Sequence, residues 1–172
     1  MEWKNICKNE VNEQQNLIKM EIKYFDGDVL TSTAPIIMHQ VNCQGTMRSG
    51  VAKAISEKWP IVEEKYKNFC KTLSSEELLG STQVVKVNDN QYVANLFGQD
   101  KYGYNGKKYT SYDAIDNALR ILLKKMESNS INRLAMPYKM SSDRGGADWD
   151  VILAIITSIF KDSDIIIEIW KL

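Results

Sequence analysis

The stretch PIIMHQVNCQGTMRSGVAKAISEK, residues 35–58, contains the transition on which the fold assignment depends. Residues 35–42 form an aliphatic run that begins at a proline, which is typical of a strand buried on both faces of a partly parallel sheet. A polar loop with Gly and Ser follows over residues 43–49, and apolar residues then recur at helical spacing from Gly50. A buried strand, a glycine-bearing loop and a helix in this order indicate an α/β fold.

The same alternation continues on both sides of this stretch. The patterns predict strands at residues 22–25, 35–42, 82–87, 91–97, 133–136 and 164–170, and helices at 50–58, from 60 to about 73, at 112–128 and at 147–160. The sequence Asn88-Asp89-Asn90 predicts a tight hairpin between two neighbouring strands. We therefore expect a three-layer α/β/α fold with a mixed, mostly parallel central sheet of about six strands.

Length and charge limit the domain organisation and the kinds of partner. The 172 residues suit one domain, which we expect over residues 20–172, with a polar N-terminal extension over residues 1–19. Because 22 basic residues balance 22 acidic ones, no overall charge attracts a nucleic-acid backbone or an anionic membrane. An anionic ligand must therefore be held by local groups.

Cysteine usage and hydropathy bear on location and cofactors. The three cysteines show no metal-ligand spacing and form an odd number, which indicates a reduced setting. No apolar stretch approaches the roughly 20 residues that cross a bilayer, and no signal-peptide pattern is recognisable. We expect a cytoplasmic protein with no membrane partner, no metal site and no cofactor.

Two glycine-bearing loops are the candidates for anion binding. Residues 43–49 and 141–146 each contain one of the four arginines, Arg48 and Arg144, and each leads into a predicted helix. Free backbone N–H groups and the helix dipole favour an anion at such positions. A P-loop is excluded, because Val51 and Ala52 stand where Lys and Ser or Thr would be needed, and no GxGxxG follows a strand. The loops therefore predict a phosphate site made mainly of backbone groups.

Four segments in order resemble the macrodomains, which bind ADP-ribose. They are FDGDVL (25–30), IMHQVNCQGTMRSGVA (37–52), residues 137–149 with GGADW at 145–149, and IEIWKL (167–172). The similarity is greatest to the branch with ADP-ribose 1″-phosphate phosphatases and terminal ADP-ribose protein glycohydrolases, and it covers about residues 20–172. It implies a macrodomain-like fold whose ligand is ADP-ribose or a derivative, with an ADP-ribosylated macromolecule as a further possible partner.

The resemblance assigns roles to individual residues. Asp28 would accept a hydrogen bond from the adenine amino group, with Gly27 and the Val29 N–H beside it, and Asn42 would hold the distal ribose. The distal ribose and phosphates would lie between two sets of loop residues: Gly45, Met47, Ser49, Gly50 and Val51 on one side, and Ser141, Ser142, Asp143, Arg144 and Gly145 on the other. Aromatic surface would come from Phe97, Tyr104 and Trp170. The single histidine, His39, is expected to be a hydrogen-bonded core group on the strand face opposite Gln40.

The chain departs from the family pattern at positions that matter for chemistry. Where relatives usually have Gly-x-Gly in the second loop, this chain has Ser141-Ser142-Asp143. Where the glycohydrolase branch has a catalytic lysine and aspartate, the matching residues are Gln99 and Gly145.

These residues leave three functional hypotheses open. The leading one is hydrolysis of ADP-ribose 1″-phosphate or a related ADP-ribosyl derivative, in which Asn42 orients the ribose or a water and Asp143 or Asp148 acts as base. The second is a non-catalytic binder of ADP-ribose or a cyclic derivative. The third is an ADP-ribosyl hydrolase that acts on modified protein or nucleic acid.

Overall fold

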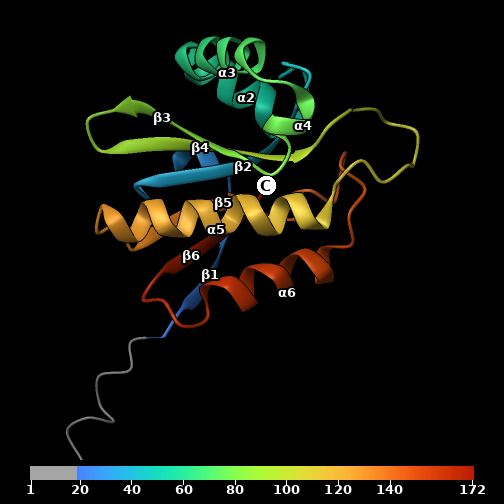
Figure 1. The fold of residues 1–172 in the computed structure, drawn as a ribbon. Helices are drawn as coiled ribbons and strands as arrows, with labels where there is room; N and C mark the ends of the chain where they lie inside the picture. The colour runs from blue at the N-terminus through green and yellow to red at the C-terminus, as the bar shows by residue number, and fades with distance from the viewer. Residues whose placement is uncertain (1–18) are drawn as a thin grey trace, which may run out of the picture.

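The computed structural model describes residues 19–172, and Figure 1 shows a sheet between two groups of helices. The six strands are β1 (Glu21–Asp26), β2 (Ile36–Asn42), β3 (Thr82–Asn88), β4 (Gln91–Gln99), β5 (Arg133–Pro137) and β6 (Ile166–Lys171). They lie in the order β1-β6-β5-β2-β4-β3, and only β3 pairs antiparallel with its neighbour. The predicted mixed, mostly parallel sheet is confirmed. The expected extension at residues 1–19 lies, apart from its last residue, outside the described part.

Helices cover both faces of this sheet. In Figure 1, α2 (Gly50–Lys58), α3 (Pro60–Thr72) and the short α4 (Ser75–Leu78) lie on one face, and α5 (Tyr112–Ser128) and α6 (Trp149–Phe160) lie on the other. A 3₁₀ turn, η2 (Val29–Thr31), lies in the connection between β1 and β2. The predicted three-layer α/β/α arrangement is therefore confirmed.

The central strand β2 contributes to two separate cores. Ile36 and Met38 belong to the cluster under α5 and α6, whereas Ile37 and Val41 belong to the cluster under α2 and α3. This alternation follows from the two-residue period of a strand, whose side chains point to opposite faces in turn. Because both faces of β2 are covered, the strand is apolar along most of its length, as the sequence indicated.

One element was not predicted from the sequence. Helix α4 begins at the N-cap Ser74, whose side chain accepts a hydrogen bond from the Glu77 N–H, while the Glu77 carboxylate accepts one from the Ser74 N–H. This reciprocal capping box is encoded by the spacing of a serine and a glutamate three residues later. The signal was present in the sequence, but the helix is only one turn long and has no apolar period.

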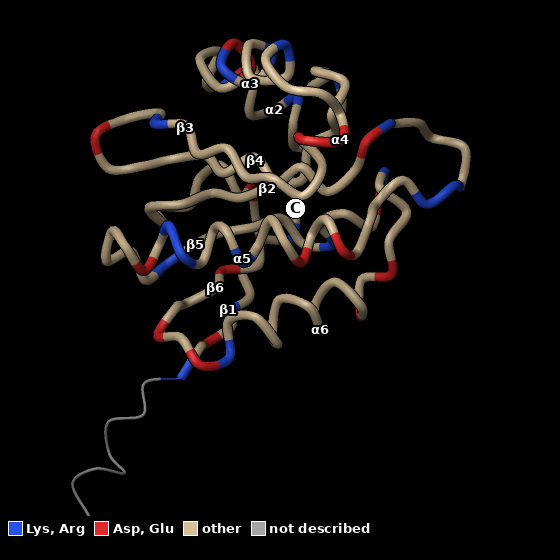
Figure 2. The backbone as a smooth tube through the Cα atoms, viewed as in Figure 1, with Lys and Arg blue, Asp and Glu red and all other residues tan. Residues whose placement is uncertain are grey.

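The carboxyl ends of the parallel strands gather several loops at one edge of the sheet. The loops after β2, β4 and β5 all start there, and each leads toward the N-terminus of a helix, as Figure 1 shows. In open α/β sheets this edge is where ligands bind. Figure 2 shows charges of both signs spread over the loops and outer helices, in line with the balanced composition. No helix in the described part has both the length and the apolar character that a bilayer span requires.

Candidate functional site

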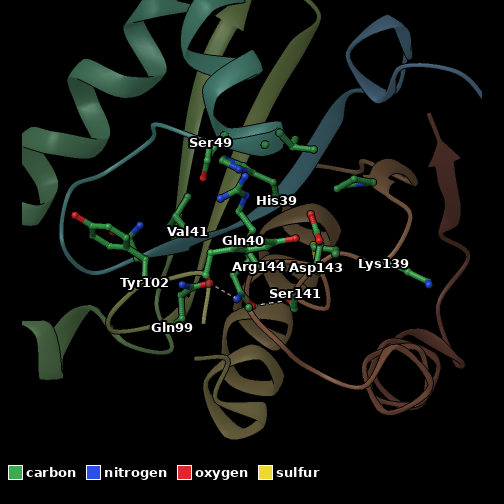
Figure 3. Close-up of a pocket in the computed structure, with 18 of the residues that line it drawn as sticks. His39, Gln40, Val41, Ser49, Gln99, Tyr102, Lys139, Ser141, Asp143 and Arg144 are labelled. Atoms are coloured by element: carbon green, nitrogen blue, oxygen red, sulfur yellow. Dashed lines mark hydrogen bonds between the residues drawn. The ribbon is translucent and has the colours of Figure 1, made fainter. Parts of the chain in front are cut away.

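A cavity of about 600 Å³ opens at the carboxyl edge of the sheet. Figure 3 shows side chains from β2, the end of β4 and the loop after β5 around it. The loops on either side supply most of the lining: Asn42, Thr46, Arg48, Ser49, Gly50 and Val51 from the first, Gln99, Tyr102, Gly103 and Tyr104 from the second, and Lys139, Met140, Ser141, Asp143, Arg144 and Gly145 from the third. The two glycine-bearing loops that the sequence singled out therefore face a common space.

The side chain of Asn42 organises the loop that follows β2. Its Oδ1 accepts hydrogen bonds from the backbone N–H of Gln44 at 3.0 Å, the N–H of Thr46 at 3.3 Å and the hydroxyl of Tyr66 at 2.8 Å. Its Nδ2 donates to the Thr46 carbonyl at 2.9 Å. Asn42 lines the cavity but is only 8% exposed. Its amide is thus used to shape the loop, and its contact with a ribose or a water stays a prediction.

The start of α2 contributes to this loop backbone N–H groups that have no partner among the described residues. Gly50 has a φ of +57° at the first helical position, a conformation that favours glycine. Within residues 19–172, the N–H groups of Ser49, Gly50 and Val51 have no hydrogen-bond acceptor in the protein, as expected for the first turn of a helix. These free amides lie in the cavity lining with the Arg48 side chain.

Two residues of the first loop do not reach the cavity. Met47 is 2% exposed and packs in the core between the sheet and the helices α2 and α3. Its side chain therefore belongs to the core, although the sequence had predicted it at the ligand site. Gly45, with a φ of +73°, lies against Cys70 of α3 instead. The neighbouring Cys43 is buried, which raises the pKa of its thiol to about 12 and keeps it protonated near neutral pH.

The loop after β5 turns sharply under the cavity. Ser141 adopts a φ of +70°, which is uncommon for a residue with a side chain, and Gly146 a φ of +67°. The Gly145 carbonyl accepts from the N–H groups of Tyr109 and Thr110, both at 2.9 Å. The N–H groups of residues 143–146 have no acceptor in the described part of the protein. This loop therefore offers a second group of free amides opposite the α2 start.

Side chains of this loop divide between the cavity and its surroundings. Asp143 and Arg144 line the cavity, and the Arg144 guanidinium lies 4.8 Å from the ring centre of Tyr104, a cation–π contact with the loop after β4. Ser142 is not in the lining, and its hydroxyl lies 3.5 Å from the Met140 carbonyl. Asp148 is also outside the cavity.

Asp148 has a capping role at the next helix. Its Oδ1 accepts a hydrogen bond at 2.8 Å from the Asp150 N–H and caps the N-terminus of α6. An aspartate at the N-cap satisfies one free donor and interacts well with the helix dipole. Asp148 is exposed and lies outside the cavity lining, and its role as a base stays a prediction.

The residues expected to contact adenine lie at the carboxyl ends of β1 and β6. Asp28 is exposed, and its Oδ1 accepts a hydrogen bond from the Leu30 N–H at 2.9 Å, which leaves Oδ2 without a protein partner among the described residues. Gly27 has a φ of +134° and lies against the Trp170 ring. The Phe25 and Trp170 rings stack with centres 4.7 Å apart. These residues form a polar and aromatic surface outside the cavity itself.

The two other expected ligand residues differ in their surroundings. Val29 is buried in the core under α2 and α3, so only its backbone is available at this turn. Phe97 is fully buried, and its ring packs 5.8 Å from that of Tyr66 and 5.7 Å from that of Phe69. The prediction that Phe97 contacts the ligand is therefore wrong, because helix α3 covers its ring near the end of β4. Phe25, which was not singled out, takes the exposed aromatic position instead.

His39 is a buried group next to the cavity. It is 2% exposed, and its Nε2 lies 2.6 Å from Oδ1 of Asn95, on the strand face opposite Gln40 as alternation predicts. Because Nδ2 of Asn95 donates to Gln83, its Oδ1 faces the histidine, which places the proton on Nε2. Burial lowers the pKa of His39 to about 4, so the ring is neutral at pH 7. Its Nδ1 is buried without a hydrogen-bond partner among the described residues.

Sequence reasoning missed the polar floor of the cavity. Gln40, Gln99 and Tyr102 line it, although none was singled out as a ligand residue. A polar side chain inside the aliphatic run of β2 was the available signal for Gln40. No group of three or more His, Cys, Asp or Glu side chains suited to a metal ion occurs within residues 19–172.

Comparison with known proteins places this geometry in a family. A curated relative from Lodderomyces elongisporus, named ADP-ribose 1″-phosphate phosphatase, is 26% identical over 154 residues, which cover 81% of this chain and 93% of the relative. A solved protein of unknown function from Bacteroides thetaiotaomicron has a TM-score of 0.80 at 28% identity, covering 89% of this chain and 99% of that one.

A third similarity concerns the fold alone. The structure of Thermosipho africanus DarTG in complex with ADP-ribose has a TM-score of 0.73 at 18% identity, covering 88% of this chain and 42% of that one. The family model described as Macro domain matches residues 38–156, which is more than half of the chain and includes both glycine-bearing loops. The chain therefore belongs to the macrodomain family.

Proposed function

We propose that this macrodomain binds ADP-ribose at the carboxyl edge of the sheet and hydrolyses ADP-ribose 1″-phosphate or a related ADP-ribosyl derivative. The observation that carries the proposal is that two sets of residues with free backbone amides, 49–51 and 143–145, line one cavity. The relative named ADP-ribose 1″-phosphate phosphatase and the ADP-ribose complex of the DarTG structure support the choice of ligand.

The charges and shapes of the site suit the parts of this ligand. Backbone N–H groups at a helix start bind phosphate without any positive side chain, and Arg48 and Arg144 add charge at the same cavity. Asp28 has a carboxylate oxygen available for the adenine amino group, and the stacked Phe25 and Trp170 rings offer an aromatic surface beside it. The diphosphate would then bridge the adenine end and the cavity.

Hydrolysis of the 1″-phosphate requires little beyond positioning and charge stabilisation. Water would attack phosphorus, the bond from phosphorus to the ribose oxygen would break, and the products would be ADP-ribose and inorganic phosphate. The loop amides would stabilise the negative charge on the transferred group. The exposed carboxylate of Asp143, which lines the cavity, is a suitable acceptor for the proton of water.

Phosphate release from ADP-ribose 1″-phosphate tests the proposal. We expect Asn42→Ala to lower the rate sharply because the loop after β2 loses its organising amide, and Asp143→Asn to lower it if that carboxylate accepts the proton. Asp150→Asn is the matched control, since Asp150 is an exposed aspartate just after the same loop and outside the lining. An unchanged rate in Asn42→Ala removes this residue from the mechanism.

A non-catalytic binder of ADP-ribose or a cyclic derivative is the second candidate, and the second loop is the reason to test it. Ser141-Ser142-Asp143 adds side chains and a negative charge beside the proposed phosphates, which suits an altered ligand as well as altered chemistry. Calorimetry with ADP-ribose, a cyclic derivative and ADP-ribose 1″-phosphate, followed by turnover assays on those that bind, separates the two candidates. Binding without product release assigns the binder.

Removal of ADP-ribose from a modified protein or nucleic acid is the third candidate. It is weakened by Gln99, whose carboxamide cannot act as a nucleophile and is held by hydrogen bonds to Gln40 and to the Lys101 carbonyl. Gly145 likewise has no carboxylate to offer. Release of label from an ADP-ribosylated substrate would restore this candidate.

A further inference from the structure

Gln40, Thr110 and Ser141 form a closed hydrogen-bonded ring at the floor of the cavity, and Gln99 is bonded to this ring through Gln40. Nε2 of Gln40 on β2 donates to Oε1 of Gln99 at 2.7 Å and to Oγ1 of Thr110 at 2.8 Å. Thr110 donates to the Ser141 carbonyl at 3.0 Å, and the Ser141 hydroxyl donates back to Oε1 of Gln40 at 2.6 Å. Figure 3 shows Gln40 between Gln99 and Ser141. One carboxamide thus joins β2 to the loops after β4 and β5.

The direction of every bond in this ring is determined by backbone carbonyls. Nε2 of Gln99 donates to the Lys101 carbonyl at 2.8 Å, so its Oε1 must face Gln40 as an acceptor. The Thr110 proton goes to the Ser141 carbonyl, so this hydroxyl accepts from Gln40. The side-chain donors of Gln40, Thr110 and Ser141 are all used, and no side chain in this network is a carboxylic acid, thiol or imidazole. The ring therefore has a positioning role rather than a catalytic one.

The backbone around the ring is adapted to Gln40. A Cβ at Gly98 would overlap Oε1 of Gln40 and the Ile115 side chain, and a Cβ at Gly145 would overlap the Thr110 hydroxyl and the Ser141 carbonyl. Glycine at both positions allows the close approach that the ring needs. Any larger residue would displace the carboxamide or the loop.

Ser141 has a strained backbone conformation, and the hydrogen bonds of the ring stabilise it. Its φ of +70° is unfavourable for a residue with a Cβ, yet its side chain is 9% exposed and its hydroxyl and carbonyl are both bonded within the ring. The same carbonyl accepts from the Ala147 N–H at 3.0 Å, which closes the loop over residues 142–146. The free amides of residues 143–146 lie within this closed turn.

We infer that Gln40 is a positioning residue, which holds the loop after β5 so that the amides of residues 143–145 face the ligand. This inference rests on the proposed function, because it assigns those amides to the phosphates of ADP-ribose. Gln40 also lines the cavity, but all three hydrogen bonds of its carboxamide go to Gln99, Thr110 and Ser141, so it acts on the ligand by holding the loop. Its loss should weaken binding even where the protein remains folded.

The test compares two glutamine-to-methionine variants by calorimetry with ADP-ribose, well below the melting temperature of each protein. Gln40→Met removes all three hydrogen bonds of the ring carboxamide and should raise Kd about tenfold or more. Gln91→Met is the matched control, because Gln91 is a buried glutamine whose Nε2 also donates twice, to the carbonyls of Ser32 and Ala34 at the other edge of the sheet. This control should lose thermal stability and keep Kd within about twofold.

A pair of variants at position 141 provides a second measurement. Ser141→Ala keeps the unfavourable φ and loses the hydroxyl, whereas Ser141→Gly loses the hydroxyl but adopts that φ without strain. Ser141→Ala should therefore weaken ADP-ribose binding more than Ser141→Gly does. Equal losses would contradict the role of the ring in holding this turn.

Hydrogen exchange separates a failure of this inference from a failure of the proposed function. Without ligand, Gln40→Met should increase amide exchange over residues 139–147 while leaving residues 44–52 as in the wild type. If the wild-type protein does not bind ADP-ribose, the proposed function fails and the exchange pattern alone decides the inference. Wild-type affinity together with wild-type exchange in Gln40→Met overturns it.

Discussion

The buried histidine makes the stability of this protein dependent on pH in a calculable way. His39 has a pKa of about 4 in the folded protein because burial disfavours its charged form, against 6.5 in its ordinary state. The folded pKa is the lower one, so below pH 6.5 the unfolded chain binds a proton that the folded chain does not. Stability from this residue is therefore complete above pH 6.5 and is lost as pH falls toward 4.

The size of the effect follows from the same two pKa values. Relative to pH 7, the histidine should lower the free energy of unfolding by about 2 kcal/mol at pH 5 and about 3 kcal/mol at pH 4. Urea unfolding of the wild type and of His39→Gln at pH 7, 6 and 5 measures it. Carboxylates contribute equally to both proteins, so the difference between their unfolding free energies isolates His39.

The comparison has a clear refuting outcome. If the wild type and His39→Gln lose the same stability between pH 7 and pH 5, His39 is not a buried neutral group.

Three further substitutions are expected to act through contacts described above, each measured by urea unfolding at pH 7. Tyr66→Phe should cost about 1–2 kcal/mol, because the fully buried hydroxyl donates to the carbonyl and Oδ1 of Asn42; no change would mean that this loop is held otherwise. Gly145→Ala should cost about 1–3 kcal/mol through overlap with its neighbours, and an unaffected protein would show that the turn yields easily. Glu168→Gln should lower the free energy of unfolding by about 2 kcal/mol, since the buried carboxylate accepts a hydrogen bond from the partly exposed Arg133. If this loss became smaller when salt was added, the pair would behave as a surface ion pair instead.

Most of the fold was predictable because the spacing of apolar residues agrees with the positions of prolines, glycines and capping residues along the chain. Pro60 opens a helix directly after α2, as its fixed φ and missing N–H allow, and the Ser111 side chain caps the start of α5. The aliphatic run of β2 was identified as a doubly covered strand from its composition alone. The short helix α4 was not predicted because a single helical turn shows no periodic spacing of apolar residues.

The candidate site was predictable as loops and less so as side chains. The glycines and arginines of residues 43–49 and 141–146 indicated which segments face the cavity. The sequence does not show which side chains of those loops turn inward, and packing decided that Met47 and Phe97 join the core. Asp148 was ambiguous because a capping aspartate and a catalytic one have the same local sequence. Gln40 gained its place only through three partners distant in the chain.

The position of β6 between β1 and β5 has a consequence for how the site is assembled during synthesis. Until residues 166–171 emerge, β1 has no hydrogen-bonding neighbour in the sheet, and Phe25 has no Trp170 to stack against. The stacked Phe25 and Trp170 rings thus join the earliest and the latest parts of the described residues, whereas the loops around the cavity are complete beforehand. A nascent chain halted before residue 166 would carry both glycine-bearing loops but leave an unpaired strand exposed to aggregation.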